Sequence, residues 1–260
     1  MSAVQSFQVA LVTGAQRGIG RAIALELARN RIHVALVDTS VSAELLAVVK
    51  EVEAMGIRAA PFAADVAAIE AHESVLDNVE TILGPLNCLV NNAGVGVLTR
   101  GDLLDVTPQS YDRCLDINTR GTFFLTQAFA RRLIDRPPTA NVHRSVITVT
   151  SSNATAVSIA RVEYCVSKAA LSMTSRLFAV RLAPYNIGVY EIQPGFIETE
   201  MTAPVKARYD ALIENGITAM PRWGTPDDVA RVAATLARGE LPYTVGQPIQ
   251  VDGGLLIAKY

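Results

Sequence analysis

The sequence has few cysteines and few charged residues, and each scarcity excludes a class of protein. The three cysteines are Cys88, Cys114 and Cys165, and none lies in a Cys-x-x-Cys pair. Disulfide frameworks and zinc sites need more cysteines at closer spacing. We therefore expect reduced thiols in a cytoplasmic protein and no bound metal.

The chain also lacks the features of nucleic-acid-binding, membrane and secreted proteins. Its 23 basic and 25 acidic residues give a formal charge of −2, so we expect no strongly basic surface and no nucleic-acid partner. No apolar run reaches the roughly 18 residues that a membrane helix needs. Residues 1–9 have no basic segment followed by an apolar one, so we expect no secretory signal.

Short apolar segments alternate with longer helical patterns along all 260 residues. Such apolar strands, separated by helices, are typical of a parallel sheet covered on both faces. The expected strands are 9–12, 34–37, 58–62, 88–90, 146–149, 188–192 and 248–251. The expected helices are 19–29, 43–55, 69–83, 108–134 with an interruption at 118–121, 163–182 and 226–236. We predict an α/β protein of one domain, 1–260: a three-layer, doubly wound Rossmann fold with a seven-stranded parallel sheet, whose ligand crevice lies at the carboxyl ends of the strands.

A glycine-rich turn, Thr13-Gly14-Ala15-Gln16-Arg17-Gly18-Ile19-Gly20, follows the first expected strand. Gly14 permits a tight turn, Gly18 lets the backbone approach a pyrophosphate, and Gly20 allows close packing of helix and strand. Amides at the start of the following helix would then point at the phosphates. This placement favours dinucleotide binding. The spacing differs from the common Gly-x-Gly-x-x-Gly, so an ordinary tight turn is the alternative.

Asp38 ends the second expected strand, 18 residues after Gly20. A carboxylate there can accept hydrogen bonds from the adenosine ribose and would repel a 2′-phosphate. Arg17 acts in the opposite direction, because its guanidinium could bind that phosphate. We expect NAD as the cofactor, with NADP as the alternative. Taken alone, Asp38 could also be a helix-capping or turn residue.

Tyr164 and Lys168 are spaced to share one face of a helix. A nearby ammonium should lower the pKa of the phenol from its usual value near ~10 and make it an acid–base group; an exposed surface pair is the alternative. Ser151 follows a strand, 13 residues before the tyrosine, and could hydrogen-bond a substrate carbonyl. Asn118 interrupts a helix, and its carbonyl or side chain could hold a water beside Lys168.

These residues together make the chain resemble the short-chain dehydrogenase/reductase family from the first strand to the C-terminus. The matching motifs are Thr13-Gly-x-x-x-Gly18-Ile-Gly20, Asp65-Val66, Asn91-Asn92-Ala93-Gly94, Asn118, Ser151, Tyr164-x-x-x-Lys168, Pro194-Gly195 and Val251-Asp252-Gly253-Gly254. The chain is most similar to the branch of 3-oxoacyl-(acyl-carrier-protein) reductases and many sugar, polyol and cyclic alcohol dehydrogenases.

The resemblance implies roles for the matched residues. Tyr164 would be the acid–base residue, Lys168 would lower its pKa and hold the nicotinamide ribose, Ser151 would orient the substrate oxygen, and Asn118 would complete a proton relay. The motif alone would also allow Ser152, but the 13-residue spacing favours Ser151. The expected cofactor-binding residues are Gly14, Gln16, Arg17, Gly18, Ile19, Gly20, Asp38, Asp65, Val66, Asn91, Ala93, Gly94, Tyr164, Lys168, Pro194, Gly195, Ile197 and Thr199.

Among these residues, the resemblance implies that Asp65 and Val66 contact the adenine. Asn91, Ala93 and Gly94 would line the ribose and nicotinamide side. The Ile197 backbone and the Thr199 hydroxyl would hold the carboxamide. The usual assembly of the family is a homotetramer in which the long tyrosine-bearing helices pack across one interface.

We therefore expect an NAD(P)-dependent oxidoreductase that transfers a hydride between the cofactor and a small secondary alcohol or ketone. A 3-oxoacyl-thioester reductase that uses NADPH and a catalytically silent nucleotide-binding regulator are the alternatives. Residues 196–223 are expected to cover the substrate, and 136–144 to form a surface loop.

Overall fold

The computed structural model describes residues 7–259; most of the N-terminal stretch on which the signal-peptide prediction rests lies outside this range. Seven parallel strands form one sheet in the order β3-β2-β1-β4-β5-β6-β7. The strands are β1 (Val9–Thr13), β2 (His33–Asp38), β3 (Ala59–Ala63), β4 (Cys88–Asn91), β5 (Ser145–Val149), β6 (Gly188–Pro194) and β7 (Pro248–Val251). The predicted doubly wound α/β fold is confirmed.

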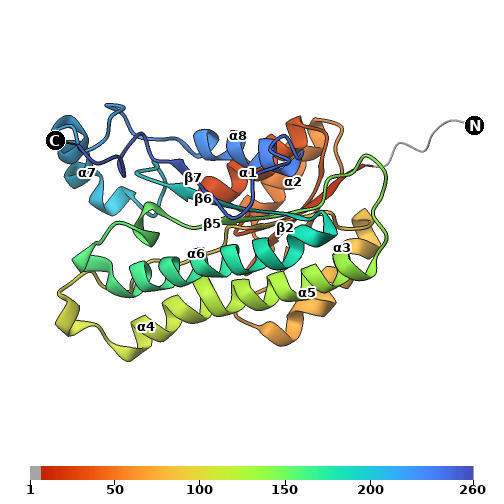
Figure 1. Cartoon of the computed structure of the whole chain (residues 1–260), viewed down its shortest axis with the longest axis horizontal. Helices are drawn as coiled ribbons and strands as arrows, with labels where there is room; N and C mark the ends of the chain where they lie inside the picture. Colours follow the sequence, from red (N-terminus) through yellow and green to blue (C-terminus); the bar gives the residue numbers. More distant parts are fainter. Residues whose placement is uncertain (1–6, 260) are drawn as a thin grey trace, which may run out of the picture.

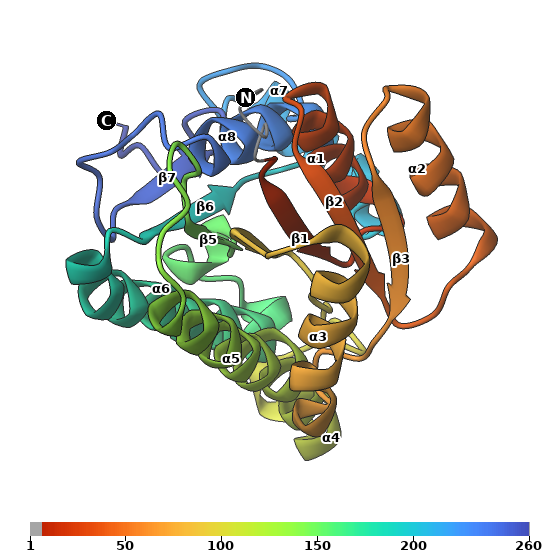
Figure 2. The same cartoon turned by 90° about the vertical axis from the view of Figure 1, so that its right-hand side faces the viewer.

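Helices cover both faces of this sheet (Figures 1 and 2). The first face carries α1 (Gly18–Arg29), α2 (Ala43–Ala54) and α8 (Pro226–Ala237), and the second carries α3 (His72–Leu83), α5 (Thr122–Asp135) and α6 (Val162–Leu182). The alternation along β1 explains why its whole length is apolar. Ala10 and Val12 pack into the first layer, while Val9 and Leu11 pack into the second.

The helical pattern expected over 108–134 is divided into three parts. Helix α4 (Pro108–Leu115) begins where the Thr107 side chain caps the Ser110 amide at 3.3 Å. A π-helical segment, Asp116–Gly121, then leads into α5. A π-helix has a wider turn than an α-helix, and here the wider turn directs Asn118 inward, where it is fully buried. The predicted interruption is therefore confirmed.

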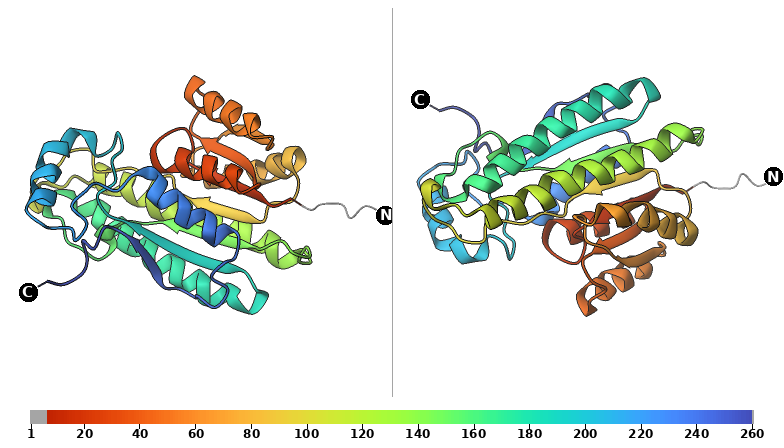
Figure 3. Two further views of the ribbon diagram at one scale, coloured as in Figure 1. Left: turned by 90° about the horizontal axis from the view of Figure 1, so that it is seen from above. Right: turned by 90° about the horizontal axis from the view of Figure 1, so that it is seen from below.

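The long connection after β6 contains the short helix α7 (Lys206–Glu214), which sequence analysis left undivided. Figures 1 and 3 place α7 and the start of α4 at the end of the molecule opposite the N-terminus, where the parallel strands end. No helix within residues 7–259 combines the length and the apolar character needed to cross a membrane.

Candidate active site

Hydrogen bonds join the glycine-rich turn to the residues that follow β4. A Cβ atom on Gly20 would lie 2.0 Å from the Gly14 carbonyl oxygen, so only glycine fits. The Asn92 side chain donates to the carbonyls of Thr13 at 2.9 Å and Gly14 at 3.2 Å. The Thr13 hydroxyl in turn accepts from the amides of Asn92 at 3.0 Å and Ala93 at 2.9 Å. These bonds fix the conformation of the turn.

Asp38 lies beside this turn, as predicted. Its carboxylate accepts from the Gln16 amide at 3.2 Å and from the Thr39 amide at 2.9 Å. Arg17 points away from the carboxylate and forms a largely exposed ion pair with Glu200 at 2.7 Å. This pair joins the turn to the segment after β6, although an exposed pair contributes little to stability.

The predicted adenine and ribose residues lie on the next two strand ends. Asp65 accepts from the Ala67 amide at 2.9 Å, and Val66 is buried. The Asn91 side chain turns into the helix layer, where it donates to the Thr126 hydroxyl at 2.9 Å. Only the backbone of Asn91 is therefore left to face a cofactor.

Helix α6 places Tyr164 and Lys168 one turn apart. The Lys168 Nζ lies 5.7 Å from the centroid of the Tyr164 ring and donates to the Val149 carbonyl at 3.1 Å. The side chain that lowers the pKa of the Tyr164 phenol is Ser151 rather than Ser152. A Cβ atom on Gly94 would lie 3.5 Å from this Nζ, so the glycine leaves the lysine its space.

The titration of this pair differs from the sequence expectation. Desolvation raises the pKa of Tyr164, while the Ser151 side chain and the charge of Arg161 lower this pKa in part. Desolvation also lowers the pKa of Lys168 to about 8. Arg161 is the cation that lowers the phenol pKa here, and burial outweighs its effect. The expectation that Lys168 lowers this pKa stays a prediction.

Asn118 holds the loop after β4 against α6. Its Oδ1 accepts from the Val95 amide at 2.8 Å, and its Nδ2 donates to the Val95 carbonyl at 3.0 Å and to Ser167 Oγ at 2.9 Å. The side chain is thus fully engaged. Because the side chain is engaged, only the backbone carbonyl of Asn118 remains to hold a water beside Lys168.

The segment after β6 lies on the other side of the candidate site. Gly195 packs on β7, where its amide donates to the Val251 carbonyl at 3.0 Å. Ile197 is buried, and its carbonyl accepts from the Thr202 hydroxyl at 2.8 Å. The Thr199 methyl would lie 3.6 Å from a Cβ on Gly18, so the segment touches the glycine-rich turn.

Sequence reasoning missed three residues that shape this region. Asn92 and Thr202 act through hydrogen bonds that only the folded chain brings together. Arg161 lies three residues before Tyr164, and its Cζ lies 5.4 Å from the ring centroid. Arg161 lies just before the first residue of α6, so no helical spacing in the sequence relates it to Tyr164.

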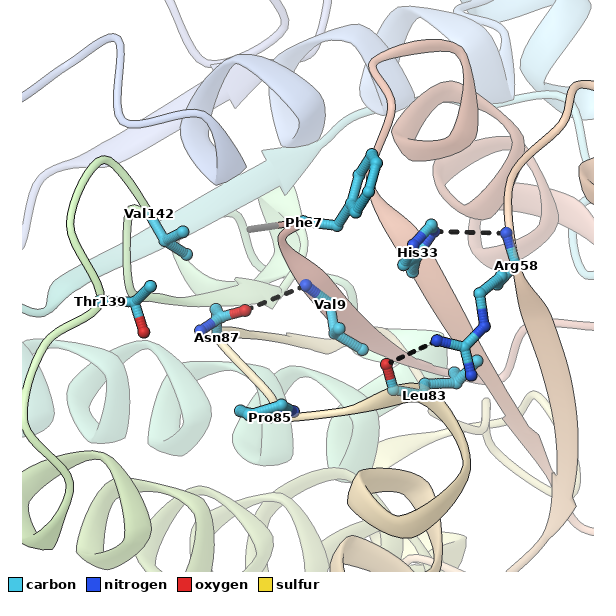
Figure 4. A pocket seen from close by; sticks show the side chains of 9 residues that line it. All are labelled: Phe7, Val9, His33, Arg58, Leu83, Pro85, Asn87, Thr139 and Val142. Atoms are coloured by element: carbon cyan, nitrogen blue, oxygen red, sulfur yellow. Dashed lines mark hydrogen bonds between the residues drawn. The ribbon is translucent and has the colours of Figure 1, made fainter. Parts of the chain in front are cut away.

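A separate cavity of about 220 Å³ lies at the opposite, amino-terminal edge of the sheet (Figure 4). The Phe7 ring stacks on His33 at 4.8 Å between centroids. The Arg58 guanidinium donates to the Ile82 and Leu83 carbonyls and so caps the end of α3. The predicted site residues do not line this cavity.

Comparison with known proteins agrees with this arrangement. A family described as enoyl-(acyl carrier protein) reductase matches residues 14–256. The 3-oxoacyl-(acyl-carrier-protein) reductase FabG of Staphylococcus aureus is 34% identical over 249 residues, covering 95% of this chain and 97% of that protein.

Two solved structures are also similar. The 3-oxoacyl-(acyl-carrier protein) reductase of Brucella melitensis in complex with NAD has a TM-score of 0.95 and 42% identity, and the match covers 98% of this chain and 100% of that chain. A blue fluorescent protein from a metagenomic library, in complex with NADPH, has a TM-score of 0.84 and 32% identity, with 96% and 98% covered. The chain therefore belongs to the short-chain dehydrogenase/reductase family and is an NAD(P)-dependent oxidoreductase in the branch that resembles 3-oxoacyl-(acyl-carrier-protein) reductases.

Proposed function

We propose that the protein interconverts a small secondary alcohol and its ketone, with Tyr164 as the acid–base residue. The observation that carries this proposal is the placement of Lys168, which is buried with its Nζ 5.7 Å from the centroid of the Tyr164 ring. The Ser151 side chain also acts on this phenol and lowers its pKa. A nucleotide-binding regulator would have no use for this arrangement.

The residues of the crevice fit a dinucleotide. The backbone of the turn at Gly14–Gly20 would bind the pyrophosphate, and Asp38, beside this turn, would bind the ribose hydroxyls. Lys168 would hold the nicotinamide ribose, and the Ile197 backbone and Thr199 hydroxyl its carboxamide. The nicotinamide, when bound, accepts or supplies the hydride.

The side chains then handle the proton and the orientation of the substrate. In oxidation, Tyr164 as phenolate takes the proton of the substrate hydroxyl; in reduction, Tyr164 as phenol gives the proton back. Ser151 hydrogen-bonds the same substrate oxygen. The Asn118 carbonyl would hold a water that passes protons to Lys168 and onward to the ribose and tyrosine.

We propose NAD as the preferred cofactor. Asp38 would repel a 2′-phosphate, whereas Arg17 is already paired with Glu200. The Brucella melitensis relative binds NAD, which agrees with this preference. The second candidate function, reduction of 3-oxoacyl thioesters with NADPH, is favoured by the activity named for the Staphylococcus aureus relative.

One assay separates these candidates. A panel of secondary alcohols with NAD and with NADP, together with 3-oxoacyl thioesters and each reduced cofactor, is followed by the absorbance of the reduced nicotinamide. We expect turnover of alcohols with NAD at a higher kcat/KM than with NADP. Turnover only of thioesters with NADPH would establish the second candidate, and no turnover of any pair would contradict both.

We also propose that the protein is a cytoplasmic homotetramer. Within each subunit, residues 196–223 would cover the substrate. Four apolar side chains form an exposed stripe on α6: Val166, Met173, Leu177 and Val180, with exposures of 38, 52, 59 and 74%. A second copy of this helix would cover the stripe. In light scattering, the wild-type chain should have four times the monomer mass, and Leu177→Glu should lower the mass. A monomeric wild type would refute the assembly.

The cover over the substrate would be the α7 region. The Phe196 and Tyr209 rings stack at 4.4 Å, and Trp223 Nε1 donates to Asp210 at 2.6 Å. These contacts give 196–223 a packed inner side rather than a loose loop, as a cover over a substrate requires.

A further inference from the structure

Arg161 is a cation beside the catalytic tyrosine that no carboxylate neutralises. No carboxylate among residues 7–259 lies in ion-pair distance of its guanidinium. Its Nε is buried and, within the same residues, has no hydrogen-bond partner. Buried polar groups in proteins are normally satisfied, so this orphaned donor calls for an explanation.

The contacts that Arg161 does make direct it at the reacting group. One Nη donates to the Asn153 side chain, whose own backbone amide donates to Ser151 Oγ at 3.1 Å. The guanidinium Cζ lies 5.4 Å from the centroid of the Tyr164 ring. Arg161 is thus fixed next to the two side chains that would hold the substrate oxygen, with donors to spare.

Nearby acidic groups are engaged elsewhere. Glu163 is buried two residues along the helix, and its carboxylate accepts a hydrogen bond from Ser110 on α4. The Asp102 carboxylate accepts from the Leu104 amide at 2.9 Å, and Asp102 and Asp105 line a small cavity together with Val162 and Glu163. The charge of Arg161 is therefore left for a group that the chain itself does not provide.

Resting on the proposed function, we propose that Arg161 binds a carboxylate of the substrate, so that the alcohol or ketone is a short hydroxy acid or oxo acid. A guanidinium matches a carboxylate in a planar, two-pronged arrangement. Because the Arg161 Cζ lies 5.4 Å from the centroid of the Tyr164 ring, a carboxylate bound to the guanidinium would lie only a few bonds from the reacting carbon. A thioester, which has no charge there, would leave the guanidinium unpaired.

The test compares each acid with its neutral amide. We would measure kcat/KM with NAD for 2-, 3- and 4-hydroxy acids of four or five carbons and for the matching hydroxy amides, using the wild type, Arg161→Gln and Arg161→Lys. Arg181→Gln is the matched control, because Arg181 also lies over a tyrosine ring, with its Cζ 5.1 Å from the centroid of Tyr185, but at the far end of α6. Thermal unfolding with NAD and each compound gives a binding readout that does not depend on turnover.

The wild type should favour the acid over the amide for at least one chain length. A charge-assisted hydrogen bond predicts that Arg161→Gln lowers kcat/KM for that acid by about tenfold to a hundredfold and leaves the amide within about threefold. Arg161→Lys should restore part of the preference, and Arg181→Gln should leave it unchanged. The acid should raise the unfolding temperature of the wild type but not of Arg161→Gln.

Equal use of acid and amide by the wild type, or an equal loss of both in Arg161→Gln, would overturn the inference. Turnover of neutral secondary alcohols without a preference for acids would contradict the role of Arg161 but leave the proposed function intact. Absence of turnover with every alcohol, acid and amide would contradict both the proposed function and the role of Arg161.

Discussion

Asn118 and Val95 hold each other through two opposed hydrogen bonds, one donated by the Val95 amide at 2.8 Å and one accepted by its carbonyl at 3.0 Å. A side-chain amide is the one uncharged group that can supply both a donor and an acceptor in this geometry. This pair fixes the loop after β4 beside Lys168, so the site depends on a residue with a fully engaged side chain.

Replacement of Asn118 should therefore destabilise the fold as well as the site. Asn118→Ala leaves the Val95 amide and carbonyl without their partner and removes one hydrogen bond of Ser167 Oγ, so we expect the free energy of unfolding to fall by about 2 kcal/mol or more. Urea denaturation measures this loss. Asn215→Ala, which removes one exposed bond to the Ala211 carbonyl, is the control and should change little. Equal effects of the two variants would contradict the assignment.

Gly20→Ala should damage the cofactor crevice. The added methyl would meet the Gly14 carbonyl oxygen at 2.0 Å, so the turn must shift. We expect the Kd for the reduced cofactor, measured by its fluorescence, to rise by about tenfold or more, which corresponds to about 1.4 kcal/mol. Gly101→Ala is the matched control, because its new methyl meets nothing within 4 Å. Unchanged binding in Gly20→Ala would show that the cofactor binds elsewhere.

Asp38→Asn should shift the cofactor preference toward NADP. The amide keeps a hydrogen-bonding oxygen for the Gln16 amide and removes the charge that would oppose a 2′-phosphate. We expect the ratio of kcat/KM for NADP to that for NAD to rise by about tenfold, as steady-state kinetics would record. A ratio that stays constant would mean that Asp38 does not face the ribose.

Lys168 should make stability depend on pH in a defined direction. Its folded-state pKa of about 8 is below the ordinary value of 10.5, so the charged form costs stability below pH 8 and this cost disappears as pH rises toward 10.5. The cost is about 3 kcal/mol at most.

Lys168→Met removes this titrating group. The unfolding free energy of the wild type minus that of the variant should therefore rise by up to about 3 kcal/mol between pH 8 and pH 10.5. Urea denaturation across this range gives the difference. A difference that is flat or falls with pH would contradict the lowered pKa.

The sequence predicted the fold because short apolar segments, such as 9–12 and 146–149, alternate with longer helical patterns along the chain. The glycine-rich turn, Asp38 and the Tyr164–Lys168 spacing lie where they were expected to lie. The functions of these residues remain predictions.

Three details could not be read from the sequence. The phenol pKa depends on how deeply the folded chain desolvates Tyr164, and no spacing reports that. The engagement of the Asn118 side chain depends on Val95, a contact 23 residues away. The open donors of Arg161 depend on the absence of a spatial neighbour within residues 7–259, which a linear pattern does not encode.

The acid–base role of Tyr164 is tested by the pH dependence of alcohol oxidation in the wild type and in Tyr164→Phe, with cofactor binding measured in parallel. Because desolvation raises the phenol pKa, the phenolate grows only at alkaline pH, so wild-type kcat/KM should rise with pH. Tyr164→Phe should bind the cofactor as the wild type does and lose this rise together with at least about a hundredfold of the rate. A variant that retains the wild-type rate and the same pH profile would show that the proton moves through another group.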